Sequence, residues 1–258
     1  MKRWCYRIAL CLCVCLLTLG LCGRMEAAEG TCGESLTWSL DGDGVLTIRG
    51  TGEMADYQAF STPWEDNRWR IKSAVVESGV TSIGANTFYC AQSMTTITLP
   101  ASVTKIGAGA FSSCGALKNV ELPASITSIS YATFSGCSGL MNVTIPDGVT
   151  SIGSEAFENC SSLQTITIPQ GVTSISYAAF SGCSGLTNVT IPSGVTSIDT
   201  KAFADCSSLV QITLPARLRE ISGFNGCSSL QTITIPQGVT SISSDAFGGC
   251  SSLTNVTI

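Results

Sequence analysis

The stretch Leu186–Ser208, LTNVTIPSGVTSIDTKAFADCSS, is one copy of a unit that recurs almost unchanged from Ile71 to the last residue. Apolar and polar residues alternate in its first half as in a β-strand, and the letters PSG that follow predict a turn. A unit this short cannot bury its own apolar face, so copies must stack on one another. The stretch therefore predicts a parallel-stranded solenoid.

The repeat spacing is regular apart from one copy. Later copies open at Met94, Leu117, Leu140, Leu163, Leu186, Leu209, Leu230 and Leu253, 23 residues apart except for 21 after Leu209. The two missing residues fall in a loop just before Phe224, so we expect a local pinch that leaves the stack unbroken. From the first strand at Ile71 onward we expect nine parallel strands in register.

Residues 1–28 have the layout of a secretory signal peptide, with basic residues ahead of an apolar run from Ile8 to Cys22. That run is shorter than the roughly 20 residues that a membrane-spanning helix needs. We expect cleavage between Gly23 and Ala28 and no membrane span thereafter. Attachment of a lipid at Cys22 is the alternative.

The composition of the mature chain restricts its function. From residue 29 onward there are nine Lys and Arg against 17 Asp and Glu, a net charge of about −8, which argues against nucleic acid as a partner. The absence of histidine removes the commonest general base and the commonest nitrogen ligand of zinc. Five carboxylates lie in the variable loops: Glu155, Glu158, Asp199, Asp205 and Asp245. Nothing singles out a catalytic pair among them, although the sequence does not exclude one. We expect no enzyme activity, cofactor or metal site.

Residues 29–70 differ from the repeats and predict an N-terminal capping segment. Residues 36–40 and 45–48 alternate around the sequence DGDG, which predicts a β-hairpin. The same letters suggest a calcium loop, but the further acidic ligands are missing and a plain turn is favoured. Every tryptophan of the mature chain lies between Trp38 and Trp69. This aromatic cluster either seals the first coil, which we favour, or stacks on sugar rings.

The repeat pattern LxxVxIPxGVTSIxxxAFxxCSS resembles the BspA-like group of leucine-rich repeats, and TCG, LTW and PW near the start resemble the region that often precedes such arrays. The resemblance implies a fold of the α/β leucine-rich repeat class, dominated by β-structure, with the array over residues 71–258. It also implies a secreted or surface-displayed protein with a role in adhesion. A carboxy-terminal cap is missing, so we expect the array to continue beyond Ile258.

Two rows of outward-facing polar residues form the candidate binding face. One row is Thr98, Glu121, Thr144, Thr167, Thr190, Thr213, Thr234 and Thr257, and the other includes Asn119, Asn142 and Asn188. Threonine also suits a half-exposed strand, so β-propensity and solubility remain an alternative explanation. The face predicts recognition of a protein or glycan on a host or neighbouring cell. The alternative function is a carbohydrate-binding accessory domain of a larger secreted enzyme.

The cysteines separate into a ladder and two others. Each ladder cysteine lies three residues after a phenylalanine, and we expect these to be buried, reduced thiols: Cys114, Cys137, Cys160, Cys183, Cys206, Cys227 and Cys250. In the first copy Ala91 takes the ladder position, so Cys90 should point away from it. Cys32 and Cys90 either form a disulfide that tethers the cap to the solenoid, or remain separate thiols.

Overall fold

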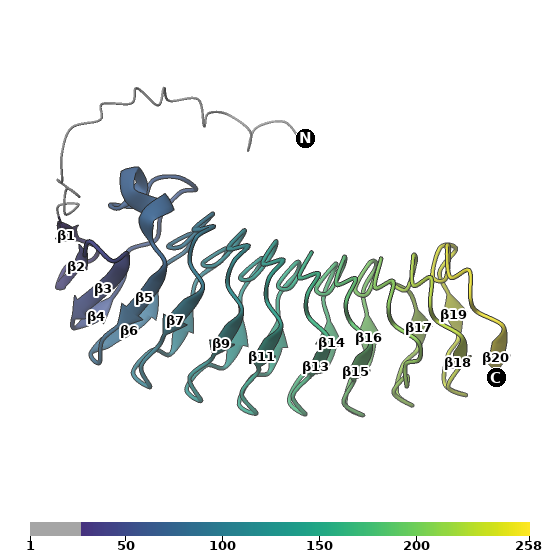
Figure 1. The fold of residues 1–258 in the computed structure, drawn as a ribbon. Helices are drawn as coiled ribbons and strands as arrows, with labels where there is room; N and C mark the ends of the chain where they lie inside the picture. Colours follow the sequence, from purple (N-terminus) through teal and green to yellow (C-terminus); the bar gives the residue numbers. More distant parts are fainter. Residues whose placement is uncertain (1–26) are drawn as a thin grey trace, which may run out of the picture.

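The computed structural model describes residues 27–258. The predicted signal peptide lies outside the described residues except for its last two positions. Figure 1 shows a single row of coils that runs from an amino-terminal sheet to the last repeat, with the strands of successive coils side by side. This is the predicted solenoid, and its axis runs along the direction in which the coils stack.

Most coils contribute a main strand and a second short strand after the turn. The main strands are β5 (Ser73–Val76), β7 (Thr96–Thr98), β9 (Asn119–Glu121), β11 (Asn142–Thr144), β13 (Thr165–Thr167), β15 (Asn188–Thr190), β18 (Thr232–Thr234) and β20 (Asn255–Thr257). The second row is β6 (Val80–Ile83), β8 (Lys105–Ile106), β10 (Ser128–Ile129), β12 (Ser151–Ile152), β14 (Ser174–Ile175), β16 (Ser197–Ile198), β17 (Glu220–Ile221) and β19 (Ser241–Ile242). Where these strands pair, they pair in parallel. Within residues 27–258 there is no α-helix, and the remainder of each coil consists of turns.

The expectation of nine main strands was wrong by one, because the short copy that opens at Leu209 forms none. It retains a single parallel bridge between Gln211 and Thr232. The stack itself is unbroken there, since the Phe203 and Phe224 rings remain stacked with centroids 5.6 Å apart. A coil that is two residues shorter keeps its ring column and its second strand, so the mismatch falls on the main strand.

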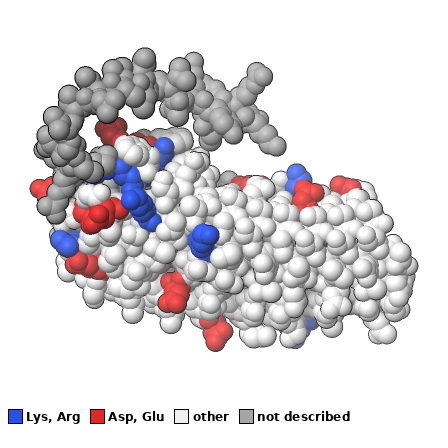
Figure 2. All heavy atoms as spheres, in the orientation of Figure 1, with Lys and Arg blue, Asp and Glu red and all other residues white. Residues whose placement is uncertain are grey.

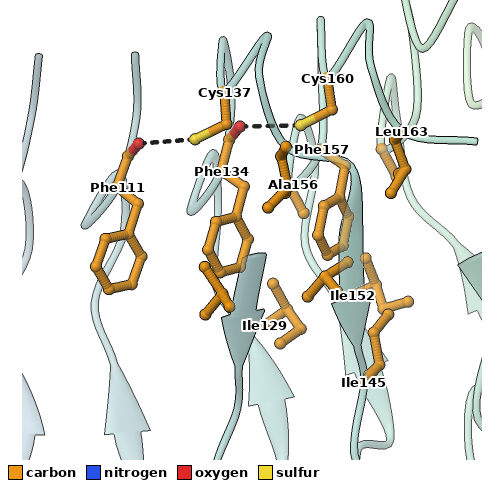
Figure 3. Packing of buried hydrophobic residues seen from close by; sticks show 14 of the residues in the cluster. Phe111, Ile129, Phe134, Cys137, Ile145, Ile152, Ala156, Phe157, Cys160 and Leu163 are labelled. Carbon is orange, nitrogen blue, oxygen red and sulfur yellow. Dashed lines mark hydrogen bonds between the residues drawn. The ribbon is translucent and has the colours of Figure 1, made fainter. Parts of the chain in front are cut away.

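The apolar core contains a column of phenylalanine rings, of which Figure 3 labels Phe111, Phe134 and Phe157 among the other buried side chains. From Phe88 to Phe247 successive rings lie 5.3 to 5.9 Å apart between centroids and within 12° of parallel. These rings bury large apolar areas, and aromatic pairs at such distances add about 0.5–1.5 kcal/mol beyond the burial itself. The column therefore makes each coil depend on its neighbours.

Left-handed backbone bends the chain on either side of most of these rings. Two residues before the ring the positive φ angles belong to Asn86, Gly109, Ala132, Glu155, Ala178 and Lys201, and two residues after it to Cys90, Ser113, Gly136, Asn159, Gly182, Asp205, Gly226 and Gly249. Glycine adopts this region without strain, whereas other residues pay a steric cost. The tight bends bring backbone groups of adjacent coils within hydrogen-bonding distance, as in the 2.9 Å bond from the Phe111 N–H to the Thr133 carbonyl.

The prediction of buried ladder thiols is confirmed for six of the seven cysteines, whereas Cys250 near the last coil is only partly buried. Each ladder sulfur donates a hydrogen bond of 3.0 to 3.3 Å to the carbonyl of the phenylalanine one coil earlier, and Figure 3 draws two of these bonds. Burial raises the pKa of the Cys137, Cys183 and Cys227 thiols to about 12. The cysteines are thus protonated donors that link one coil to the next, and thiolate chemistry is suppressed.

The register predicted for the first copy is also confirmed. The Ala91 N–H donates to the Phe88 carbonyl at 3.0 Å, just as the Cys114 N–H donates to Phe111 at 3.1 Å. Ala91 therefore occupies the ladder position. Cys90 instead takes the left-handed position before it, with φ of 56°.

The amino-terminal hairpin forms as predicted and becomes part of the solenoid sheet. Strands β1 (Ala28–Thr31), β2 (Leu36–Leu40) and β3 (Val45–Gly50) are antiparallel, and β3 then pairs in parallel with β5. A further strand, β4 (Gly52–Glu53), pairs with β6. In the turn between β2 and β3, Asp41 Oδ1 accepts the N–H groups of Asp43 and Val45 at 2.9 and 2.8 Å. The Asp41 carboxylate thus stabilises the turn itself.

The aromatic cluster of the cap divides into a sealing part and an exposed part. Trp64 is buried, stacks on Phe88 at 6.1 Å and meets Trp38 edge-on at 5.6 Å, so it extends the ring column into the cap. Trp69, in the 3-10 helix η1 (Glu65–Arg70), is 65% exposed, and Phe60 is exposed as well. The sealing interpretation therefore holds for Trp38 and Trp64 but not for the whole cluster.

Cys32 and Cys90 are both buried thiols in the structure, and the disulfide between them stays a prediction. The Tyr57 hydroxyl donates to the Cys32 carbonyl at 3.2 Å, and the Tyr57 ring meets that of Trp64 at 6.1 Å. Because Trp64 in turn stacks on Phe88, two aromatic rings connect the surroundings of Cys32 to the first coil of the array. Packing of these rings holds the cap to the solenoid.

Candidate binding face

The main strands place the predicted polar row on the surface. All of its residues are exposed: Thr98, Glu121, Thr144, Thr167, Thr190, Thr213, Thr234 and Thr257. Parallel pairing sets Glu121 beside Thr144, Thr167 beside Thr190, and Thr234 beside Thr257. Thr213 belongs to the short copy and lies outside any strand. The row is thus a real alignment of side chains with one irregular position.

The second polar row is exposed and lies alongside the first. Pairing sets Asn119 beside Asn142, and the Asn142 amide donates to Asn119 Oδ1 at 3.2 Å. Asn188 pairs with Thr165 on the neighbouring strand. This hydrogen bond between side-chain amides of adjacent coils fixes the rotamers of two residues that would otherwise be mobile on the surface.

The cap extends this face, a continuation that the repeat pattern did not predict. Residue pairing runs without a break from Ser39 to Thr47, then to Val75 and then to Thr98. A hollow of about 380 Å³ lies over this part of the sheet, between Glu29, Thr37, Thr47 and Arg49 among others. The alternation of the hairpin was visible in the sequence, but its parallel pairing to β5 was not, so the cap could not be joined to the face.

Two hollows in the array part of the face lie where the strand ladder is interrupted. Within residues 27–258 no strand pairing joins β11 to β13, and a hollow of about 330 Å³ lies there, lined by Asn142, Thr144, Asp147, Thr165 and Thr167. The second, of about 240 Å³, lies between β15 and β18 beside Gln211 and Thr213. Where a ladder opens, backbone N–H and C=O groups are available to a ligand or to water.

The face carries almost no charge. In Figure 2 charged side chains gather around the amino-terminal coils, and the rest of the array surface in view is nearly all uncharged. Near the cap, Arg49 Nε and Glu77 Oε1 form an exposed ion pair at 2.8 Å. Glu121 is the single charged residue in the predicted row. Recognition by this face would therefore rely on hydrogen bonds and shape and not on long-range attraction.

Two of the loop carboxylates accept hydrogen bonds from side chains of the preceding coil. Glu155 accepts a hydrogen bond from the Tyr131 hydroxyl at 2.8 Å, and Glu158 accepts one from Ser135 at 3.2 Å. In the described part of the chain no group of three or more His, Cys, Asp or Glu is placed to hold a metal ion. Nor does any helix of that part have the length and apolar character needed to cross a membrane.

Comparison with known proteins gives the family. The chain matches the BspA type leucine-rich repeat region, in 6 copies, over residues 66–187 and 173–258. A leucine-rich repeat protein from Bacteroides ovatus aligns with a TM-score of 0.60 and 25% identity, covering 87% of this chain and 64% of that one. The T. pallidum leucine-rich repeat protein aligns with a TM-score of 0.55 and 25% identity, covering 69% and 90% respectively. No curated protein matches the chain.

Proposed function

Because the chain belongs to the BspA-type leucine-rich repeat family, we propose that it is a non-catalytic recognition protein that binds its partner through the main-strand face. The observation that carries the proposal is the face itself. Its threonine and asparagine rows are exposed and in register over several coils, and its ladder opens at two hollows. A partner that lies along the face meets the same polar groups in coil after coil.

The partner that suits this surface is a protein or a glycan on a host or neighbouring cell. Uncharged hydrogen-bonding groups in a shallow, extended surface suit a broad partner more than a small molecule enclosed in a pocket. The predicted signal peptide supports export, and with it a location outside the cell or on its surface. The net negative charge disfavours nucleic acid.

A triple substitution tests the face. Thr144 and Thr167 line one hollow, and Thr167 pairs with Thr190 on the next strand. We expect the combined change Thr144→Lys, Thr167→Lys and Thr190→Lys to weaken binding at least about tenfold, because three long cations would occupy the contact surface. Binding of the purified chain is measured on an array of immobilised extracellular-matrix proteins and cell-surface glycans.

A matched control has the same number of lysines on the same stretch of the solenoid. Thr127, Thr150 and Thr173 are exposed threonines that precede the second-row strands, and their change to lysine adds the same charge away from the face. The control variant should bind like the wild type. The proposal fails if the triple variant retains wild-type binding while its circular dichroism and melting temperature show that it is folded.

A further inference from the structure

The turn side of the solenoid carries two exposed tyrosines at equivalent positions of the repeat. Tyr131 is 54% exposed and Tyr177 is 41% exposed. They lie two coils apart, and the coil between them has Ser154 at the same position. Exposed tyrosine is typical of binding surfaces, because its ring offers apolar area and loses little conformational entropy when bound. Neither ring contributes to the buried core or to the main-strand face.

Each tyrosine is held by the residue at the left-handed position of the next coil. The Tyr131 hydroxyl donates to Glu155 Oε2 at 2.8 Å, and the Lys201 ammonium lies 5.9 Å from the centroid of the Tyr177 ring. Glu155 and Lys201 have φ angles of 58° and 61°, so the same bend of the coil presents both side chains. Rings that are restrained before a ligand arrives lose less freedom on binding.

The coil repeat sets the separation of the two rings. Tyr131 and Tyr177 each lie three residues before a core phenylalanine, and the intervening centroid steps, Phe134 to Phe157 and Phe157 to Phe180, are 5.4 Å each. Because those core rings are nearly parallel, the same translation relates the two tyrosine positions, which are therefore about 11 Å apart. Each sugar unit of an extended β-1,4-linked chain adds to its length about the spacing between two adjacent coils.

From this arrangement we propose that Tyr131 and Tyr177 form a binding site for a linear β-1,4-linked polysaccharide that lies along the solenoid axis. Alternate sugars place their C–H faces on the two rings, and the sugar between them lies over Ser154. The carboxylate of Glu155, which already accepts from the Tyr131 hydroxyl, has lone pairs left for a sugar hydroxyl.

A protein partner fits this surface less well than a glycan. Protein interfaces have a contiguous apolar centre, whereas these two rings are separated by a coil with a serine at the equivalent position. A polysaccharide has apolar faces and hydroxyl groups that repeat along its length. It can therefore stack on the two separate rings and form hydrogen bonds with the surface between the rings. The site is independent of the main-strand face, so each proposal stands or fails separately.

The test measures binding of cellohexaose, xylohexaose and chitohexaose to the full chain by isothermal titration calorimetry. We expect at least one hexasaccharide to bind, and Tyr131→Ala or Tyr177→Ala alone to weaken it about tenfold. The double variant should abolish binding. The corresponding disaccharide should bind at least about tenfold more weakly than the hexasaccharide, because it cannot reach both rings.

Trp69→Ala serves as the control, since it removes another exposed aromatic side chain, in the cap, and should leave hexasaccharide binding unchanged. Circular dichroism verifies that the tyrosine variants fold, as expected for exposed positions. The proposal is overturned if none of the three hexasaccharides binds the wild type. It is equally overturned if the folded double variant binds as the wild type does, or if a disaccharide binds as tightly as the hexasaccharide.

Discussion

At the scale of single residues, the ladder cysteines are structural hydrogen-bond donors. A thiol is small enough for the space beside the ring column and still reaches the phenylalanine carbonyl of the preceding coil, at 3.0 Å from Cys137 to Phe111. The Phe111 carbonyl also accepts a hydrogen bond from the Cys114 N–H at 3.1 Å, so the Cys137 thiol donates to the second lone pair of that carbonyl oxygen. An ionised sulfur could neither donate this bond nor be buried without cost.

Alkaline pH should therefore weaken the fold through these thiols. The pKa of Cys137 is about 12 in the folded protein, against 9.0 for an unperturbed thiol. Below pH 9 both states are protonated and the contribution is complete; between pH 9 and 12 only the unfolded thiol loses its proton. The free energy of unfolding should then fall by about 1.4 kcal/mol per pH unit for each such cysteine.

Urea unfolding at pH 8, 9, 10 and 11 measures this effect, with Cys137→Ala as the comparison. The variant starts from a lower stability at pH 8 but should lose less as the pH rises, because one titrating thiol has been removed. Parallel pH profiles for the two proteins would contradict the assignment of the raised pKa to Cys137.

At the scale of the element, the coil is shaped by left-handed residues on either side of its ring. Ala178 has a φ of 51° although it has a Cβ, whereas Gly109 occupies the equivalent position three coils earlier. The steric cost of such a position is about 1–2 kcal/mol for an L-residue. The ring column and the bonds between coils, including the Ala178 N–H to Thr200 carbonyl at 3.3 Å, hold the backbone there.

A pair of adjacent alanines separates backbone strain from packing. Ala178 and Ala179 are both buried, but only Ala178 has a positive φ. In Ala178→Gly the relief of strain should offset the lost methyl group and the added freedom of the unfolded chain, leaving stability within about 0.5 kcal/mol of the wild type. Ala179→Gly has no such relief and should destabilise by about 1–2 kcal/mol. Equal urea midpoints for the two variants would refute the strain at Ala178.

At the scale of the whole molecule, the amino-terminal sheet and the array form one continuous structure. Pairing of β3 with β5 joins the two sheets, and Trp64 extends the column of phenylalanine rings across the junction. A solenoid needs such a cap because its first coil would otherwise expose its apolar face. A substitution at the junction should therefore destabilise the first coils as well as the cap.

Two tryptophans of the cap provide the test of this junction. Trp64→Ala should destabilise by about 3–5 kcal/mol, since it removes a buried ring in contact with Trp38, Tyr57 and Phe88. Trp69→Ala should change stability by less than about 0.5 kcal/mol because that ring is exposed. Thermal melting gives both values, and hydrogen exchange of β1 to β3 shows whether the loss lies at the cap. Similar melting temperatures for the two variants would count against a sealing role for Trp64.

The solenoid could be predicted from the sequence, because a short repeat with fixed apolar positions has no other way to bury them. The same spacing set the ladder of thiols and the position of Ala91 within it. The hairpin between residues 36 and 50 was also determined locally, by alternation around a turn. The polar rows followed from strand alternation, although alternation alone does not say what such a row binds.

Features that depend on how one coil packs against the next could not be predicted from the sequence. The short copy has two residues fewer, and whether it forms a main strand depends on how its backbone aligns with the strands of both neighbouring coils. The opening of the ladder beside it depends on the same alignment. The joining of the cap to the main-strand face through the pairing of β3 with β5 is likewise a long-range result. So is the contact between Tyr131 and Glu155, which lie 24 positions apart and meet because successive coils stack in register.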